Sequence, residues 1–361
     1  MKRGQSMKKL FTPTQVGNMT LPHRLAMAPM TRSRANIDGT PGELAKEYYT
    51  QRASMGLIIS EGVQPSEDGQ GYPWTPGIHT KEHVEAWKEV TNAVHEKGAY
   101  FFMQLMHVGR LSHPDNTLHH RQAVAPSAIA PGTPMFTVRG MQETPTPRAL
   151  TTEEIPGVIE EFVHAAKCAV EAGADGVEIH GANGYLLHQF FSPHANVRTD
   201  EYGGSIENRA RFGLEVTKAV VDAIGAERVG FRISPRDLAY IGLYEGEETE
   251  QFYLYLIAQL AKLDVAYLHV VHAGNEPLLH QIRAAWPNAL LVNRMGRPLA
   301  QIDKDIEEGN ADVATIGAWA LSTPDFVERL KVGAPINRPD QTTFFGGDEK
   351  GYTDYPTMAE Q

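Results

Sequence analysis

Residues 176 to 185 read GVEIHGANGY, and this stretch decides the fold class. Residues 177 to 179 are short, mostly apolar and bounded by glycines, which is typical of a strand buried in a parallel sheet. His180 stands where the strand ends, and Asn183 and Tyr185 follow on a glycine-punctuated loop. In an eight-stranded α/β barrel the catalytic residues lie at this C-terminal end of the strands.

The three polar side chains of this stretch suggest a reduction. His180 and Asn183 can each donate an N–H to one oxygen, and Tyr185 can donate a proton from a phenol whose ordinary pKa is about 10. Two donors for a carbonyl beside a proton donor suit the reduction of an activated C=C bond. The alternative is a capped strand end with a hydrogen-bonded histidine, and the spacing alone does not decide between the two.

Seven further apolar runs follow the same pattern, and helix-like segments separate them. The eight runs cover residues 24–30, 57–62, 100–106, 176–181, 229–235, 267–271, 290–293 and 313–317. Strands that alternate with helices form a parallel sheet, and right-handed crossovers allow eight such units to close. Because no Gly-x-Gly-x-x-Gly follows the first strand, a doubly wound dinucleotide fold loses its main support. The sequence therefore predicts an α/β fold, a TIM (β/α)8 barrel with long βα loops.

Helix signals lie between the strands. The predicted helices cover residues 83–96, 151–172 and 205–224, and a last helix opens at residues 322–325. Thr151 and Glu154 form a capping box at the start of the second of these helices. Pro324 is expected near the first position of the last helix, where its missing N–H costs nothing.

Three long loops interrupt the pattern, at residues 107–150, 186–204 and 235–248. Loops of this length in a compact enzyme are usually functional. The first has room for a short hairpin. The tail from Asn337 is rich in proline and glycine and is expected to wrap the surface.

The composition is that of an ordinary globular protein. The chain has 361 residues, of which 42% are hydrophobic and 21% charged. We expect one barrel domain over residues 1–361, with an N-terminal extension at residues 1–10 and a C-terminal tail at residues 337–361. The formal net charge of -11 argues against nucleic-acid binding, which needs a basic face.

Cysteine and histidine usage narrows the chemistry further. The single Cys168 excludes an intramolecular disulfide and a cysteine-ligated cluster, and its apolar helical surroundings indicate a packing role. None of the 15 histidines has metal-ligand spacing on one helix, so no metal site is expected. No signal-peptide core or membrane span is present, so we expect a cytoplasmic location.

Four more strand ends carry residues that suit a flat, polar-edged ring. The first strand ends in Ala28-Pro29-Met30-Thr31 and so places a hydroxyl at the mouth of the barrel, and the second ends in Glu61-Gly62 with exposed backbone N–H. Gln104 on the third can donate and accept hydrogen bonds, and Arg232 on the fifth needs an anion or several acceptors if it is buried. Alternatively, Gln104 and Arg232 satisfy one another inside the barrel.

These motifs resemble the Old Yellow Enzyme family, specifically its bacterial ene-reductase branch with N-ethylmaleimide reductase-like members. The matching stretches are APMTR (28–32), YYTQRA (48–53), LIISEG (57–62), QLMHVGR (104–110), HGANGYL (180–186), NVRTDEYGGS (196–205) with Asn208 and Arg209, RISP (232–235) and GYTDYP (351–356). The match runs from about residue 10 to residue 356, and the segment from 196 to 209 is its most specific part.

The resemblance implies a TIM barrel with non-covalent FMN that NADH or NADPH reduces. It implies an ene-reductase whose hydride goes to the β-carbon of α,β-unsaturated carbonyls, maleimides or nitro compounds. His180 and Asn183 would bind the substrate oxygen, Tyr185 would protonate the α-carbon, and Tyr72 would line the pocket. The flavin ring would contact the stretch from Ala28 through Pro29 and Met30 to Thr31, together with Gly62, Gln104 and Arg232.

The sequence departs from the family pattern where the FMN phosphate is held. Many relatives have Gly-Arg after the eighth strand, whereas this chain has Gly317-Ala318. Our hypothesis is that Arg294 or Arg297 supplies the cation, because a guanidinium can contact a phosphate with two N–H groups. Backbone N–H groups of Met295, Gly296 and Ala318 would complete the site. Alternatively, both arginines are solvated surface charges.

Two further departures from the family pattern bear on which substrates the protein accepts. Met106 stands where relatives often have Trp and Phe345 where they often have Tyr, which predicts tolerance of bulkier electrophilic alkenes as small-molecule substrates. We expect a monomer or a homodimer.

Two other functions are alternatives to the ene-reductase. A dienoyl-CoA reductase is disfavoured because a cysteine cluster is lacking. The other alternative, motivated by Ala318, is a barrel with weakened or lost FMN binding that acts as a binding or regulatory protein.

Overall fold

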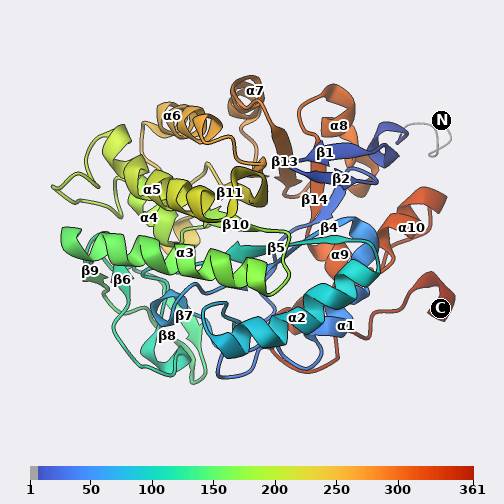
Figure 1. Ribbon diagram of the computed structural model, residues 1–361, viewed down its shortest axis with the longest axis horizontal. Helices are drawn as coiled ribbons and strands as arrows, with labels where there is room; N and C mark the ends of the chain where they lie inside the picture. Colours follow the sequence, from blue (N-terminus) through green and yellow to red (C-terminus); the bar gives the residue numbers. More distant parts are fainter. Residues whose placement is uncertain (1–6) are drawn as a thin grey trace.

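Eight parallel strands close into a barrel at the centre of the computed structural model, which describes residues 7–361 (Figure 1). The barrel strands are β3 (Leu25–Met27), β4 (Leu57–Val63), β5 (Tyr100–Leu105), β10 (Gly176–Gly181), β11 (Val229–Ile233), β12 (Tyr267–His272), β13 (Ala289–Arg294) and β14 (Val313–Ile316). They neighbour one another in sequence order, and β14 pairs with β3 to close the ring. All eight coincide with the predicted runs, so the predicted TIM barrel is confirmed.

Helices surround the barrel, and the longest of them, α2, α3 and α5, lie along its outer face (Figure 1). The helices are α1 (Ala45–Thr50), α2 (Lys81–Glu96), α3 (Ile155–Glu171), α4 (Leu186–Phe191), α5 (Ile206–Ile224), α6 (Thr249–Lys262), α7 (Glu276–Ala285), α8 (Lys304–Glu308), α9 (Ala318–Ser322) and α10 (Phe326–Val332). The predicted capping box is present, because the Thr151 hydroxyl accepts from Glu154 N and the Glu154 carboxylate accepts from Thr151 N.

Three local predictions were wrong. Helix α2 begins at Lys81, two residues before the predicted start at His83, because the Thr80 hydroxyl accepts the His83 backbone N–H and caps the helix. Pro324 precedes Asp325, the N-cap of α10, and so lies outside that helix. Residues 186–191 form α4 instead of a loop, because every residue of this apolar segment is buried against the barrel.

An apolar cluster fills the N-terminal half of the barrel interior. Its members are Val16, Met19, Leu21, Ala26, Leu57, Ile59, Phe102, Ala266, Tyr267, Ala289, Leu291 and Val313. The first three belong to the antiparallel pair β1 (Thr14–Val16) and β2 (Met19–Leu21), which covers this end of the barrel. With that end closed by packing, a ligand can enter only from the opposite end, where the strands finish.

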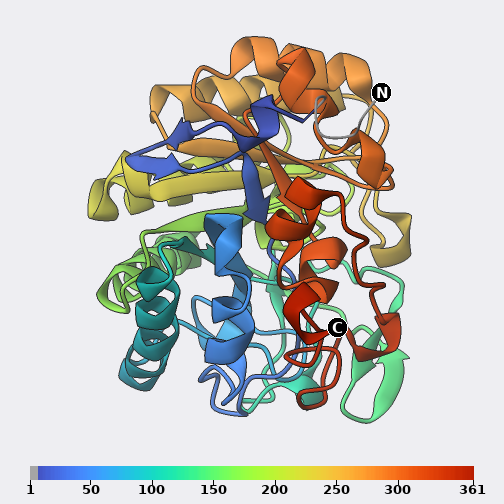
Figure 2. The ribbon, with the colours of Figure 1, turned by 90° about the vertical axis from the view of Figure 1, so that its right-hand side faces the viewer.

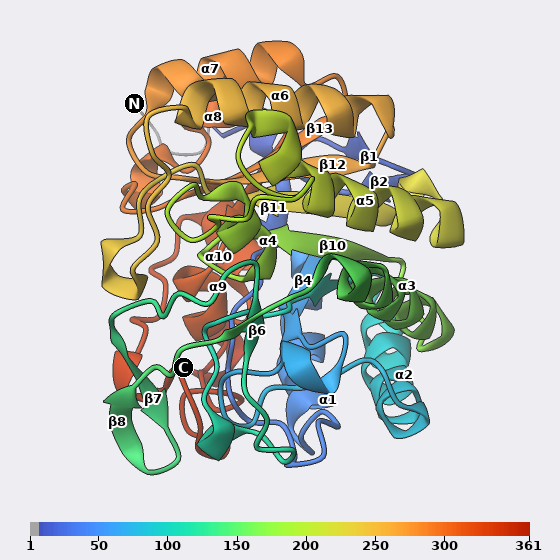
Figure 3. The ribbon, with the colours of Figure 1, turned by 90° about the vertical axis from the view of Figure 1, so that its left-hand side faces the viewer.

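The long loop after β5 contains the hairpin for which the sequence left room. Its strands are β7 (Pro134–Thr137) and β8 (Gly140–Glu143), and a short pair, β6 (Val124–Ala125) with β9 (Arg148–Ala149), flanks it. The C-terminal tail runs beside this hairpin (Figures 2 and 3). Of the predicted N-terminal extension, residues 1–6 lie outside the described residues, and Lys9–Phe11 form a 3-10 turn.

Within residues 7–361 no helix has the length and apolarity needed to cross a membrane. Cys168 is a free, buried cysteine on α3, as its apolar surroundings predicted.

Candidate active site

A cavity of about 630 Å³ opens at the C-terminal ends of the barrel strands. Its lining residues are Pro29, Thr31, Ser33, Tyr72, Pro73, Trp74, Gln104, Met106, Phe136, His180, Asn183, Tyr185, Arg232 and Phe345. Most of the predicted ring-binding and substrate-binding residues therefore meet in one place. The walls are mostly apolar, and a few polar groups converge on the interior, which is typical of a small-molecule site.

His180 is a neutral donor that points into the cavity. Burial, reinforced by the nearby charge of Arg232, lowers the pKa of its imidazole to about 3. Nδ1 accepts the Ala182 backbone N–H at 3.3 Å, so the proton of the neutral ring is on Nε2. The histidine therefore keeps one N–H for a ligand at any pH well above 3.

Asn183 is fixed beside His180 by its backbone. Its φ of +59° lies in the left-handed region, which asparagine tolerates better than most residues. Its N–H donates to the Ser234 hydroxyl at 2.8 Å, which ties the loop after β10 to the end of β11. The side chain is then free to line the cavity next to the imidazole.

Tyr185 is a phenol that stays protonated. Burial, together with the neighbouring hydroxyl of Tyr72, raises the pKa of Tyr185 well above its ordinary value. The phenol is therefore protonated at neutral pH, as its residue type indicated, and burial strengthens this by disfavouring the phenolate. The Tyr185 hydroxyl donates to the Tyr72 hydroxyl at 3.3 Å, and the Tyr185 ring packs edge-on against His180.

The turn that carries these residues is anchored from α4. Gly184 has a φ of +87°, and its N–H donates to Nδ1 of the fully buried His188 at 2.9 Å. His188 Nε2 lies 2.6 Å from a Glu245 carboxylate oxygen, which also accepts the Tyr253 hydroxyl. The loop after β11 thus holds the turn after β10 in place.

Gln104 and Arg232 do not satisfy one another, so that alternative was wrong. Gln104 Nε2 donates to the Glu178 carboxylate at 2.9 Å instead. The Arg232 Nε is buried and has no hydrogen-bond partner. A buried guanidinium nitrogen without a partner carries a large desolvation cost, so it indicates a polar or anionic group at this wall of the cavity.

Gly62 is the one predicted ring contact that does not line a described cavity. A Cβ at this position would lie 2.5 Å from the Met106 sulfur, which shows that the Met106 side chain packs over it. Met106 itself lines the cavity. The sequence placed both residues at neighbouring strand ends but did not show which of them covers the other.

Two smaller cavities extend the first one past the ends of β13 and β14. One of about 280 Å³ shares Pro29, Thr31, Arg232 and Phe345 with the main cavity and also contacts Ala28, Met30, Asn293, Gly317, Ala318, Leu321 and Phe344. The next, of about 460 Å³, shares Asn293, Gly317 and Ala318 with the second and reaches Arg294, Met295, Gly296 and Arg297. Together they form a trough from the polar strand ends to the predicted phosphate site.

The two candidate phosphate-binding arginines differ in their contacts. Arg294 donates from Nε and Nη2 to Asp305, each at 2.7 Å, and also contacts Glu276 and His272, so all three of its nitrogens are engaged. Arg297 donates from Nη1 to Asp305 at 2.8 Å. Both are largely buried, so the alternative that they are solvated surface charges was wrong.

The shape and chemistry of this trough fit FMN. The unpartnered Arg232 Nε, the Gln104 amide and the Thr31 hydroxyl suit the polar edge of a flat ring. The narrow second cavity suits a ribityl chain, and the arginine-lined third suits a phosphate. No group of three or more His, Cys, Asp or Glu side chains within residues 7–361 is arranged to hold a metal ion.

Four wall residues were missed by the sequence reasoning. Ser33, Pro73, Trp74 and Phe136 line the cavity beside the expected residues. Trp74 follows the predicted Tyr72 on the same proline-containing loop, and this proximity could have suggested it. Phe136 comes from the hairpin, and no local pattern indicated that this loop folds back over the mouth.

Comparison with known proteins supports the same reading. Residues 9–337 match the family described as NADH:flavin oxidoreductase / NADH oxidase. The chain is 40% identical to 12-oxophytodienoate reductase 2 of Arabidopsis thaliana, over 97% of this chain and 96% of that one. It is also 40% identical to a probable flavin mononucleotide-dependent alkene reductase of Leishmania infantum, over 98% and 99% of the two chains.

Solved structures agree over the same length. Morphinone reductase in complex with tetrahydroNAD superposes with a TM-score of 0.92 at 43% identity and covers 97% of each chain. The old yellow enzyme homologue from Zymomonas mobilis has a TM-score of 0.92 at 37% identity, over 96% of this chain and 99% of that one. Nothing in these likenesses supports the alternative of a binding or regulatory barrel. The chain therefore belongs to the NADH:flavin oxidoreductase / NADH oxidase family and is an FMN-dependent, NAD(P)H-driven alkene reductase of the Old Yellow Enzyme type.

Proposed function

We propose that His180 and Asn183 bind the carbonyl or nitro oxygen of an electrophilic alkene and that Tyr185 protonates its α-carbon. The observation that carries this assignment is the convergence of the three side chains on one apolar cavity whose wall holds Gln104 and Arg232. When bound, FMN takes hydride from NADH or NADPH and supplies it to the β-carbon of the alkene.

The protein's part is to stabilise the charge that develops on the substrate oxygen. His180 offers Nε2–H and stays neutral, so the donor does not need to change its protonation state during the reaction. The backbone of Asn183 is locked by Ser234, which fixes the second donor before substrate arrives. Donors fixed in advance in a cavity that excludes water are worth more than the same donors in solution.

Tyr185 then completes the reaction by donating its hydroxyl proton to the α-carbon. Its raised pKa keeps the proton in place until a strongly basic carbon centre develops beside it. The Tyr72 hydroxyl, 3.3 Å away, can return a proton to Tyr185 from the cavity mouth. The substrates are α,β-unsaturated carbonyls, maleimides or nitroalkenes, with room for bulky groups near Met106 and Phe345.

Tyr185→Phe tests the proton donor. We expect the alkene-reduction rate to fall about 100-fold or more, in the range typical of a lost general acid. FMN affinity and the rate at which NADPH bleaches the flavin should remain as in the unaltered protein. Tyr72→Phe is the matched variant: it removes the neighbouring hydroxyl and keeps the donor, so its alkene-reduction rate should fall far less than that of Tyr185→Phe. Alkene reduction at the original rate by Tyr185→Phe contradicts the assignment.

We propose further that Arg297 holds the FMN phosphate, and that the whole chain acts as one FMN-binding domain. Arg297 has donors left, whereas the nitrogens of Arg294 are engaged by carboxylates and His272. Backbone N–H groups of Met295, Gly296 and Ala318 would complete the contact.

Arg297→Met should raise the dissociation constant of FMN at least about tenfold, because a hydrogen bond to a charged group contributes ~1.5–3 kcal/mol. Arg294→Met should chiefly lower the melting temperature, because it leaves Glu276 without this ion pair and leaves Asp305 with Arg297 alone. The exposed Arg338→Met serves as the control. FMN retained at full affinity in both Arg297→Met and Arg294→Met would show that neither arginine binds the phosphate.

A further inference from the structure

A carboxylate with no role in the proposed reaction lies beneath the cavity. Glu178 is on β10, two residues before His180, and its side chain is completely buried. It is not among the residues that line the cavity. A carboxylate this deep is costly unless opposite charge and hydrogen bonds compensate for lost hydration. The groups that hydrogen-bond to Glu178 therefore indicate its role.

Both carboxylate oxygens of Glu178 are saturated by neighbouring donors. Oε1 accepts Gln104 Nε2 at 2.9 Å, and Oε2 accepts the Tyr267 hydroxyl at 2.8 Å and His269 Nδ1 at 2.9 Å. His269 Nε2 lies 2.8 Å from the Thr315 hydroxyl, which extends the network to β14. Four of the eight barrel strands therefore contribute to one network around a single charge.

The chain makes room for this network at one glycine. Gly230 on β11 lies opposite Glu178 in the strand register, and a Cβ there would be 2.1 Å from the Tyr267 ring. Because β11 has no side chain at this level, Tyr267 on β12 crosses it and reaches Glu178 on β10. A barrel interior filled only for packing does not need such a crossing.

The network holds one negative charge next to one positive charge. Burial alone would raise the pKa of Glu178, but His269, the charge of Arg232 and the Tyr267 hydroxyl outweigh it and lower that pKa. Burial lowers the pKa of His269, so its imidazole is neutral and donates from Nδ1. The charge of Glu178 thus offsets that of Arg232, which lines the cavity and whose buried Nε has no hydrogen-bond partner.

The same carboxylate fixes which way the Gln104 amide points. An ionised carboxylate can only accept hydrogen bonds, so the NH₂ of Gln104 must face it. The amide oxygen is then turned toward the cavity that Gln104 lines. The ring site is thereby presented with an acceptor at Gln104 and a donor at Arg232.

We propose that Glu178 is a positioning residue with two effects on the bound FMN: its charge, which offsets that of Arg232, sets the reduction potential, and its hydrogen bond to Gln104 orients the amide that holds the ring. On two-electron reduction FMN gains electrons and one proton and so becomes more negative by one charge. Glu178 opposes that gain, which keeps the reduced flavin a stronger donor toward alkenes. The inference rests on the proposed roles of Gln104 and Arg232.

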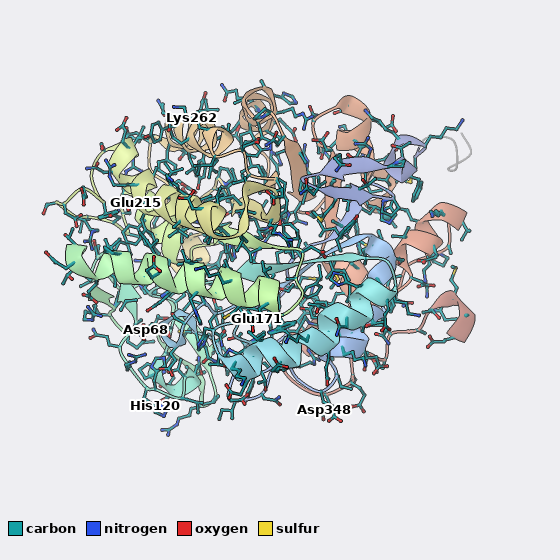
Figure 4. All side chains as sticks on the ribbon, viewed as in Figure 1. Asp68, His120, Glu171, Glu215, Lys262 and Asp348 are labelled. Carbon is teal, nitrogen blue, oxygen red and sulfur yellow. The ribbon has the colours of Figure 1, made fainter. Side chains whose placement is uncertain are left out.

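The test is the midpoint potential of FMN in the holoenzyme, measured by dye-coupled reductive titration. Glu178→Gln removes the charge but keeps acceptors for Tyr267 and His269, and we expect a more positive potential than in the unaltered enzyme. The control Glu171→Gln removes the same charge from the exposed end of α3 (Figure 4) and should leave the potential unchanged. Equal potentials in Glu178→Gln and Glu171→Gln overturn the proposal.

A second variant separates the two effects and carries the test if Glu178→Gln fails to fold. Glu178→Asp keeps the charge but shortens the reach to Gln104, so the potential should stay near its original value while the FMN dissociation constant rises about tenfold. Unchanged FMN affinity in Glu178→Asp contradicts the positioning role. An unaltered protein that takes up no FMN would instead contradict the roles of Gln104 and Arg232, which is a distinguishable result.

Discussion

At the residue scale, Glu61 is a buried carboxyl whose charge changes near neutral pH. It follows the apolar part of β4, and its side chain contacts the Tyr49 hydroxyl at 2.6 Å. Burial raises the pKa of Glu61 to about 7, although the Tyr49 hydroxyl and the charges of Arg32 and Arg34 oppose the rise. The folded protein thus favours the protonated form more than the unfolded chain does.

This raised pKa predicts a stability that falls as pH rises. The favourable contribution of Glu61 is complete below its unfolded pKa of about 4.5 and is lost as pH passes through about 7. As pH rises from 5 to 8, the free energy of unfolding of Glu61→Gln should increase by up to about 3 kcal/mol relative to that of the unaltered protein. The reason is that one pKa unit is worth ~1.4 kcal/mol.

Urea unfolding of both proteins at the two pH values measures this difference. The exposed Glu89→Gln is the control and should show no such gain. A difference between Glu61→Gln and the unaltered protein that does not change with pH would show that Glu61 ionises normally in the fold.

At the element scale, helix α4 supports the turn that carries the proposed catalytic residues. Its His188 accepts the Gly184 N–H, and its Gln189 donates to the carbonyl oxygens of Gly184 and Val108. Two consecutive left-handed residues, Asn183 and Gly184, make the turn costly to form on its own. The helix supplies the hydrogen bonds that offset this cost.

Replacing His188 should therefore loosen the substrate site without removing a group that touches substrate. His188→Leu leaves the Gly184 N–H without its acceptor and leaves Glu245 with only the Tyr253 hydroxyl, and we expect about 1–3 kcal/mol of lost stability for a buried polar group left without a partner. Binding of a phenol, detected by its charge-transfer absorbance with the flavin, should weaken at least about tenfold.

The reduction of the flavin by NADPH should be affected less than phenol binding. His188→Asn is the matched variant, because its amide oxygen can take over the acceptor role of Nδ1 and restore part of the affinity. Phenol binding that is equally strong in His188→Leu and the unaltered protein would rule out the anchoring role.

At the scale of the whole molecule, buried arginines fasten the C-terminal tail to the barrel. Arg52 is fully buried and donates to the carbonyl oxygens of Ala320, Leu321 and Tyr352. Arg32 donates to the carbonyl oxygens of Thr343, Phe344 and Gly351. These contacts place Phe345 at the cavity and the hairpin beside the tail (Figures 2 and 3).

Arg52→Met should destabilise both the tail and the end of the trough where we propose that the FMN phosphate binds. It leaves several buried carbonyl oxygens without donors, so we expect a loss of about 3 kcal/mol or more in unfolding free energy. Because Leu321 lies on α9, which begins at Ala318, the FMN dissociation constant should rise as well. Urea unfolding and FMN titration measure the two effects, with the exposed Arg338→Met as the control.

An Arg52→Met protein with the original stability and FMN affinity would show that the tail holds itself in place. A loss of stability with unchanged FMN affinity would show that the tail and the phosphate end are independent.

The sequence by itself determined the barrel and most of the site. Eight apolar runs that alternate with helices have one compact solution, and the carboxyl ends of parallel strands meet at one mouth. Thr31, Gln104, His180, Tyr185 and Arg232 could therefore be placed together although up to 201 positions separate them. The position of a polar residue at a strand end was sufficient information for this.

Only the tertiary structure decided how those residues are partnered. Gln104 pairs with Glu178, Tyr267 crosses Gly230 to join them, and Met106 covers Gly62. Side-chain direction, burial and the pKa shifts that follow from burial depend on atoms brought together from distant strands. A linear pattern contains no record of those neighbours, so the charge network beneath the proposed flavin site could be found only in the folded chain.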